Sequence, residues 1–84
     1  MSNSADMLRK EAQRRFDTAL AAETVMSGLA TRLVEMHDLP VKDLDGLEGV
    51  QRQLEQLRRS ASEARREADA LSASAEVMDR LATR

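Results

Sequence analysis

The only histidine, His37, is the first residue to consider for metal binding or acid–base chemistry. It stands close to Glu35 and Asp38 at the end of a predicted helix. A metal site needs three or four ligands that converge on one point, and side chains one or two positions apart on a helix do not face each other. His37 is better explained as a favourable charge at a helix C-terminus. The sequence therefore predicts no metal site.

The residues that nucleophilic catalysis requires are also missing. The chain has no cysteine, so it has neither a thiol nucleophile nor a disulfide framework, and a single histidine leaves no nucleophile–base pair to assemble. The many carboxylates fall on solvated helix positions, whereas catalytic carboxylates need a pocket. We therefore expect a non-enzymatic protein with no cofactor and no small-molecule substrate.

Arginines in the segment EQLRRSASEARREA, together with Arg52, could bind nucleic acid, because they form a basic stripe along a predicted helix. Acidic residues lie among them, however, and no aromatic side chain is interleaved for base stacking. The formal net charge of −2 predicts no general attraction to nucleic acid or to an anionic membrane. A nucleic-acid-binding coiled coil is therefore the least favoured function. The stripe contains Arg52, Arg58, Arg59, Arg65 and Arg66.

The composition predicts long helices around a thin core. Of the 84 residues, 33% are charged and 1% aromatic, whereas a compact domain of this size would normally fill its core with several aromatic side chains. The commonest residues are strong helix formers. No stretch is long and apolar enough to cross a membrane, and the first residues lack the apolar run of a signal peptide. We expect a soluble cytoplasmic protein.

One turn divides the chain. Pro40 disfavours helix at the residue before it and stands among several Asp and Gly residues. We expect one helix over about residues 4–37, a turn over about 38–44 and a second helix over about 45–83. The whole chain then forms a single helical-hairpin domain.

Capping signals mark where each helix begins. Ser4 is a good N-cap for the first helix, with Asp6 in its first turn. The second helix begins at Asp43 or Asp45. With Asp45 as the cap, Glu48 would complete a capping box.

Apolar residues in both predicted helices alternate steps of three and four, which is the spacing of a coiled-coil seam. Pairing residues whose numbers sum to 83 matches each layer of one seam with a layer of the other. We therefore predict an all-α antiparallel two-helix coiled-coil hairpin with arms of about 50 Å. A slip of one period, pairing between chains or one straight helix would also preserve these seams. The first seam contains Ala5, Leu8, Ala12, Arg15, Ala19, Ala22, Met26, Leu29, Leu33 and Met36. The second contains Leu47, Val50, Leu54, Leu57, Ala61, Ala64, Ala68, Leu71, Ala75, Met78 and Ala82.

Only alanine fills the middle of the paired seams, which we call the alanine waist: Ala19, Ala22, Ala61 and Ala64. Burying an alanine methyl stabilises far less than the about 1.5–3 kcal/mol of a larger apolar side chain. Either the helices approach closely at the waist, or further helices pack against it. Apolar residues outside the seam favour further helices, from the same protein or a partner, that complete a bundle. Alternatively, these residues merely flank the seam and a fraying end.

The predicted partner-binding residues are these apolar side chains and three arginines. Two of the arginines occupy e positions, which set partner choice across helix interfaces. Arg15 occupies a seam position, where it would either extend into solvent or meet a carboxylate of another chain. The full set is Arg15, Phe16, Leu20, Arg58, Arg65, Ala70, Ala73, Val77 and Leu81.

By size and layout the chain resembles the small helical-hairpin chaperones that hold the needle subunit in type III secretion. The resemblance runs from ADMLRKEAQRRF through the turn HDLPVKDLDG to ALSASAEVMDRLA, and it assigns no site residues. Those proteins are short, cysteine-free hairpins that group with partner helices. The resemblance implies a helical adaptor or chaperone that packs against helices of another protein. The alternative is a self-assembling structural coiled coil, so a homo- or hetero-oligomer is expected in either case.

Overall fold

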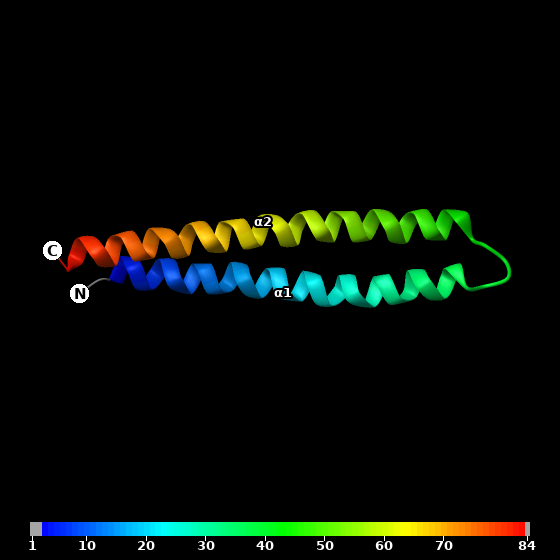
Figure 1. The fold of residues 1–84 in the computed structure, drawn as a ribbon, viewed down its shortest axis with the longest axis horizontal. Coiled ribbons are helices and arrows are strands. Elements are labelled where there is room, and N and C mark those ends of the chain that lie inside the picture. The colour runs from blue at the N-terminus through cyan, green and yellow to red at the C-terminus, as the bar shows by residue number, and fades with distance from the viewer. Residues whose placement is uncertain (1–2, 84) are drawn as a thin grey trace.

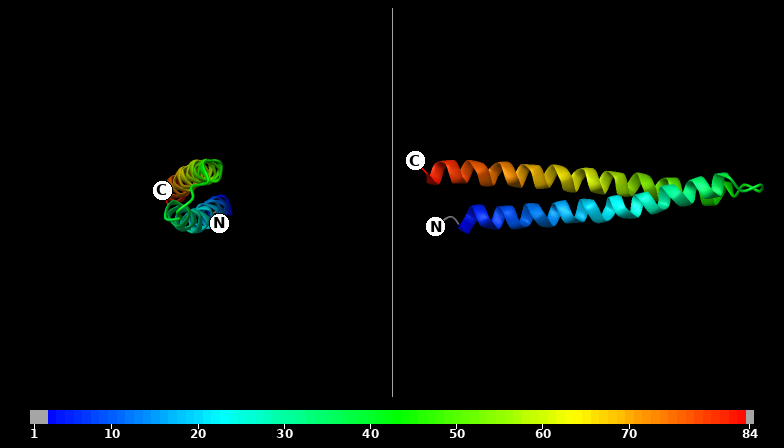
Figure 2. Two further views of the ribbon diagram at one scale, coloured as in Figure 1. Left: turned by 90° about the vertical axis from the view of Figure 1, so that its right-hand side faces the viewer. Right: turned by 60° about the horizontal axis from the view of Figure 1, so that its bottom comes forward.

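The computed structural model describes residues 3–83 and shows two long helices joined by one turn (Figure 1). Helix α1 spans Asn3–His37 and helix α2 spans Leu44–Ala82. They run antiparallel and side by side, so that the start of α1 and the end of α2 lie at the same end of a rod (Figure 2). The rod measures 67 × 14 × 13 Å. The predicted all-α antiparallel hairpin is confirmed.

Small side chains form nearly the whole buried core. Seven of the nine buried apolar residues are alanines, and the other two are Leu47 and Val50 near the turn. All nine belong to the two predicted seams. Larger seam residues such as Leu29 and Leu54 are only half-buried, because two helices cannot enclose a long side chain from every direction. Arg15 and Ala82 are the two seam residues that are exposed.

Three of the four alanines of the waist are buried by α1 and α2 themselves. Ala19 is 0% exposed, and Ala61 and Ala64 are only 5% and 7% exposed. A methyl group can be buried between two helices only if their backbones approach closely, because helix separation depends on the side chains at the contact. The expectation that further helices pack against the waist is therefore wrong for Ala19, Ala61 and Ala64. Ala22 is half-buried and keeps surface that a further helix could cover.

Cross-helix contacts fix the register of the hairpin. Arg15 Nη1 lies 2.8 Å from Glu67 Oε2, and Arg65 hydrogen-bonds to Glu23 on α1. In the register whose paired residues sum to 83, Glu67 lies next to Ala68, the residue paired with Arg15. Glu23 and Arg65 flank the two neighbouring layers of the alanine waist. A slip by one heptad in either direction would move Arg15 and Glu67 about 10 Å apart along the helix axis. The contacts therefore agree with the register predicted from the two seams.

Substituting Ala19 with leucine tests the close approach of the helices. The added side chain has no free space, so it must push α1 and α2 apart, and overpacking of this kind costs about 1–3 kcal/mol. We expect a lower midpoint of thermal unfolding, measured by circular dichroism. Ala21→Leu, on the exposed side of α1, is the matched control and should leave the midpoint nearly unchanged. A higher midpoint for Ala19→Leu would show that the waist is an unfilled cavity.

Hydrogen bonds at the end of α1 shape the turn. The backbone N–H of Asp38 donates to the carbonyl oxygens of Val34 and Glu35, at 3.1 and 3.2 Å. Lys42 Nζ donates to the carbonyl oxygen of His37. These bonds satisfy carbonyl groups that the last turn of a helix leaves unpaired.

Asp43 is the N-cap of α2. Its backbone is extended, with φ −96° and ψ 90°, and its carboxylate accepts a hydrogen bond of 3.0 Å from the N–H of Gly46. The alternative capping box of Asp45 and Glu48 is wrong, because Leu44 and Asp45 already lie inside the helix. Asp45 instead lies in the first turn, where its negative charge interacts favourably with the helix dipole.

The start of α1 also differs from the expected one. The helix includes Asn3, so Ser4 lies inside α1 and is not its N-cap. Asp6 is in the first turn, as expected. The residue that precedes Asn3 lies outside the described part of the chain.

Two glycines at the start of α2 differ in what an added methyl group would meet. A Cβ at Gly46 would lie 2.5 Å from Asp43 Oδ2, whereas one at Gly49 would meet nothing within 4 Å among the described residues. Gly49→Ala should therefore raise the free energy of unfolding by about 1 kcal/mol through helix propensity. Gly46→Ala gains the same propensity but displaces the capping carboxylate, which costs about 0.5–2 kcal/mol. Urea denaturation should rank Gly49→Ala clearly above Gly46→Ala, and equal stabilisation would contradict the role of Asp43.

Candidate interaction surface

Ten large apolar side chains within residues 3–83 are exposed, and they mark the surface on which a partner could pack. They concentrate in four places. The outer α1 stripe contains Phe16, Leu20, Glu23, Ser27, Ala30 and Val34. The mid-length groove contains Val25, Leu29, Gln53, Gln56, Leu57 and Ser60. The tip contains Leu39, Val41 and Leu44. The free-end stripe contains Ala70, Ala73, Val77 and Leu81, and Met7 is exposed near the same end of α1.

The outer α1 stripe begins with Phe16 and Leu20, which the sequence predicted to be partner-binding residues. Phe16 is 38% exposed and Leu20 is 42% exposed. The guanidinium carbon of Arg65 lies 5.2 Å from the centre of the Phe16 ring, within the range of a cation–π contact. Arg65 therefore holds one side of the ring and leaves the rest of Phe16 open to a partner.

Arg65 is also paired within the chain. Its Nε and Nη2 atoms donate to the two carboxylate oxygens of Glu23 at 2.5 and 2.8 Å, so the contact is bidentate. The hydrogen bond from Arg65 lowers the pKa of Glu23 from its ordinary value of 4.5. The pair links α1 to α2 beside Phe16 and fixes the position of the guanidinium group.

Arg58 pairs along its own helix. Its Nε and Nη2 atoms donate to Glu55 at 2.9 and 2.7 Å, and Arg59 Nε donates to the same carboxylate at 3.1 Å. The hydrogen bond from Arg58, followed by that from Arg59, lowers the pKa of Glu55 from 4.5 to about 2. Two of the five arginines of the basic stripe, Arg58 and Arg59, thus bind the same carboxylate on their own helix.

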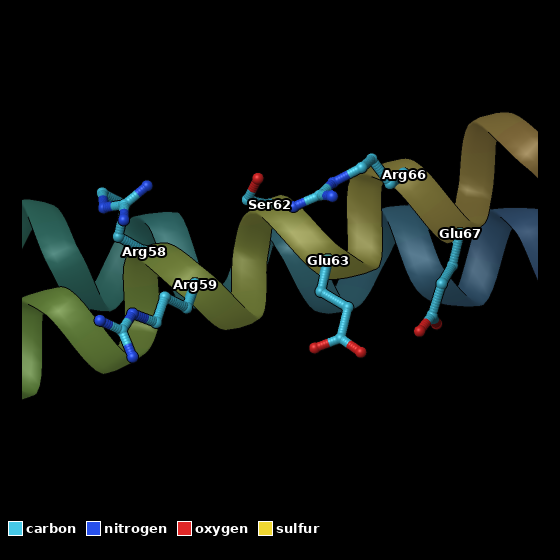
Figure 3. A pocket seen from close by; sticks show the side chains of 6 residues that line it. All are labelled: Arg58, Arg59, Ser62, Glu63, Arg66 and Glu67. Carbon is cyan, nitrogen blue, oxygen red and sulfur yellow. The ribbon is translucent and has the colours of Figure 1, made fainter.

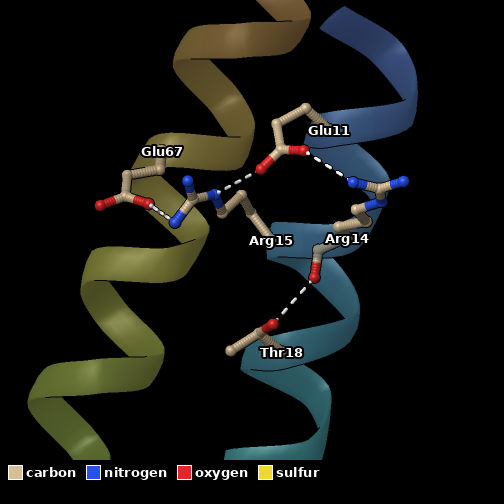
Figure 4. A network of polar contacts seen from close by, with 5 residues as sticks. All are labelled: Glu11, Arg14, Arg15, Thr18 and Glu67. Atoms are coloured by element: carbon tan, nitrogen blue, oxygen red, sulfur yellow. Dashed lines mark hydrogen bonds and ion pairs between the residues drawn. The ribbon is translucent and has the colours of Figure 1, made fainter. Parts of the chain in front are cut away.

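Arg15 bridges the two helices, as Figure 4 shows. Its Nε atom lies 3.1 Å from Glu11 on α1, and its Nη1 atom lies 2.8 Å from Glu67 on α2. Glu11 also lies 3.5 Å from Arg14. Both carboxylates that meet Arg15 belong to this chain, so no carboxylate of another chain is needed to pair its charge. All three arginines of the predicted site are thus paired internally and can contribute only a polar rim to an interface.

A shallow hollow beside the basic stripe has no enclosing wall. It has a volume of about 460 Å³ and is lined by Arg58, Arg59, Ser62, Glu63, Arg66 and Glu67. All six side chains come from α2, and Figure 3 shows them spread along its outer surface. Ligand sites are usually concave and closed by several elements. This hollow is therefore the space between successive side chains of one helix.

The mid-length groove is different, because both helices line it. Val25 and Leu29 of α1 and Leu57 of α2 form its apolar part, and three polar residues of α2 border it, enclosing about 460 Å³. Val25 is 53% exposed. An apolar floor with polar edges is the arrangement that receives a side chain of a packed helix. The sequence analysis missed this site, although an apolar residue directly beside a seam position is a signal for it.

The tip was also missed. Leu39, Val41 and Leu44 are exposed at the turn, and Val41 is the most exposed of all, at 81%. The sequence analysis took this segment only as a connection, where polar residues are the rule. Three large apolar residues within six positions of a turn were the signal that could have identified it.

The free-end stripe lies where it was expected on α2. Val77 is 54% exposed and Leu81 is 59% exposed, and Ala70 and Ala73 are exposed on the preceding turns. No side chain of the described residues 3–83 buries them. They remain candidate partner-binding residues.

Metal binding and membrane insertion are two further possibilities for residues 3–83. No group of three or more His, Cys, Asp or Glu side chains in this range is placed to hold a metal ion. His37 is an exposed basic residue in the last turn of α1. Neither α1 nor α2 contains a segment apolar enough to cross a membrane.

Comparison with family models, curated proteins and solved structures found no match for this chain. The likeness to type III secretion chaperones therefore rests on size and layout alone. The exposed surfaces of the hairpin are the observations from which a function can be inferred.

Acid should weaken the contacts that Glu23 and Glu55 make. Their pKa values are lowered in the folded chain, that of Glu55 to about 2. The stabilisation is therefore complete above pH 4.5 and is lost as the pH falls through the lowered values. When the pH is lowered below 4.5, the temperature at the midpoint of thermal unfolding should decrease. The decrease should be small, since exposed ion pairs contribute little.

Glutamine substitutions separate this effect from general acid sensitivity. Glu23→Gln and Glu55→Gln should each show a smaller fall of the midpoint between pH 7 and 2 than the unmodified protein. Glu63→Gln is the control, because Glu63 is exposed and forms no ion pair with residues 3–83. An identical fall in all four proteins would contradict the lowered pKa values.

Proposed function

We propose that this protein is a small non-enzymatic helical adaptor, which packs exposed apolar side chains of a preformed hairpin against helices of a partner protein. The observation that carries the proposal is the excess of exposed surface. The accessible surface of the described chain is 6446 Å². A compact protein of 9.3 kDa is expected to expose about 5,000 Å². The hairpin thus exposes about 1,400 Å² more than a compact protein of its mass, which exceeds the about 800 Å² of one side of a protein interface.

The mid-length groove is the surface best shaped for a partner helix. A helix laid along the rod would place apolar residues at every third or fourth position toward the groove, and Val25, Leu29 and Leu57 would receive them. Gln53 and Gln56 offer hydrogen bonds at the border. The partner is accordingly an amphipathic helix, and the free-end stripe would extend its contact toward the other end of the rod.

A chaperone-like role fits the same surfaces. A protein that shields an amphipathic helix of another chain needs apolar surface on a scaffold that folds before the partner arrives. The close contact of α1 and α2 supplies such a scaffold, because the buried alanines of the seam do not depend on a partner. The resemblance to secretion chaperones supports this role, and the secretion pathway itself is part of the proposal.

Capture of a partner from the native organism tests the proposal. Val25→Glu places a charge in the mid-length groove without touching the buried seam, and it should abolish capture of the partner, identified by mass spectrometry. Thr31→Glu introduces the same charge at an exposed position on another side of α1, away from the groove, and should retain the partner. Both variants should keep the helicity of the unmodified protein by circular dichroism. A partner captured equally well by both variants would contradict docking in the groove.

A further inference from the structure

Helix α1 carries a second set of residues at coiled-coil spacing. The outer α1 stripe occupies positions 16, 20, 23, 27, 30 and 34, which alternate steps of four and three. All of its members except Glu23 are exposed, and Val34 is 60% exposed. The buried seam of α1 is used to pack against α2, so this second seam is left without a partner in the hairpin.

The stripe is complementary to itself when read in reverse. In an antiparallel pairing of two α1 helices centred on residue 25, Phe16 faces Val34 and Leu20 faces Ala30 of the second copy. Each larger side chain then meets a smaller one. Positions 16, 23 and 30 of one copy each meet one of positions 34, 27 and 20 of the other, as a residues meet d residues in an antiparallel coiled coil. A two-fold axis generates every one of these contacts twice.

The polar residues of the stripe support the same orientation. Glu23 faces Ser27 in the antiparallel pairing. A parallel pairing would instead place Glu23 against Glu23 and Phe16 against Phe16. The parallel arrangement would thus bring two Glu23–Arg65 ion pairs together, whereas in the antiparallel one each Glu23 meets the neutral Ser27.

Charge along the rod also favours the antiparallel pairing. Residues 35–48 carry five acidic side chains and one lysine, whereas residues 9–15 carry four basic side chains and one acidic. The pairing centred on residue 25 lays residues 35–41 of one copy beside residues 9–15 of the other. Asp38 then comes close to Lys10, which forms no ion pair within residues 3–83. A parallel pairing would bring the two acidic tips together.

The size of the contact sets the expected affinity. The apolar part of the contact runs over residues 13–37, or about 37 Å at 1.5 Å per residue, and the charged residues described above extend beyond its ends. Across a rod 14 Å wide this covers roughly 500 Å² of each chain. The total of about 1,000 Å² is near the lower limit for a specific interface, so dissociation is expected in the micromolar range.

We propose that the occupant of the outer α1 stripe is a second copy of this chain, in an antiparallel two-fold dimer centred on residue 25. The proposal rests on the proposed function, in which exposed apolar faces of the hairpin are association surfaces, and it names the partner of one face. The mid-length groove and the free-end stripe stay open for the other protein. Arg65, held by Glu23 beside the Phe16 ring, keeps the aromatic side chain in place for the contact.

Sedimentation equilibrium over a micromolar concentration series tests the dimer. The average mass should rise from 9.3 kDa toward twice that value and no further. Leu20→Glu and Val34→Glu should each weaken the dimer at least tenfold with helicity unchanged. Ala21→Glu, outside the stripe, should dimerise like the unmodified protein. A monomer at every concentration, or masses beyond the dimer, would overturn the proposal.

Engineered cysteines test the orientation, because the chain has no cysteine of its own. The double variant Leu20→Cys, Ala30→Cys should form disulfide-linked dimers, since each cysteine faces the other position of the second copy. The two positions lie about 15 Å apart within one helix, too far for an internal disulfide. Each single variant should cross-link poorly. Fast cross-linking of Leu20→Cys alone would indicate a parallel pairing and overturn the model of the dimer.

The two proposals can fail separately. A protein that stays monomeric but loses its captured partner through Val25→Glu would retain the adaptor function and remove the dimer. A protein that dimerises as described but captures no partner would leave self-association as the role of the hairpin. The two measurements use different variants, on different faces of the rod.

Discussion

Alanine side chains hold α1 and α2 close together over most of their length, and this spacing determines what the rest of the chain can do. Because the backbones are close, acidic and basic side chains can reach across the seam, as Glu23 and Arg65 do. Because the core is thin, the larger seam residues remain partly exposed at its borders. The mid-length groove is a direct result, since half-buried Leu29 and Leu57 form its floor.

Charged and apolar side chains have different roles on this rod. The arginines of the predicted site satisfy carboxylates of the same chain, at Glu11, Glu55, Glu67 and Glu23, and so stabilise the hairpin or define the border of a surface. Among residues 3–83, Phe16 is the one exposed apolar residue with a charged partner inside the chain, Arg65. Association with other helices would therefore be driven mainly by burial of apolar area, with charge deciding the orientation and the choice of partner.

The fold could be predicted from the sequence because it depends on periodicity. The two seams and Pro40 were enough to give the hairpin, and the matching of layers gave its register. The closure of the alanine waist depends on how near two backbones come, which the pattern does not encode. Likewise, the choice of Asp43 over Asp45 as the cap depends on where the chain leaves its extended conformation. The pairing of Arg15 depends on side-chain rotamers, and the tip was missed because a turn is normally polar.

The distribution of buried residues has a consequence for how the hairpin forms. Leu47 and Val50, the two buried side chains larger than alanine, lie beside the turn, where only a short loop must be closed. The contacts elsewhere bury mostly methyl groups, which lose no rotamer entropy but contribute little each. Pairing of the helices would therefore begin at the turn and extend along the rod toward the free ends. The free ends would pair last and open most often. Amide hydrogen exchange that is slowest beside Leu47 and faster toward Leu81 would reveal this order. Because the free ends open most often, the free-end stripe is the surface that can adjust most to a partner.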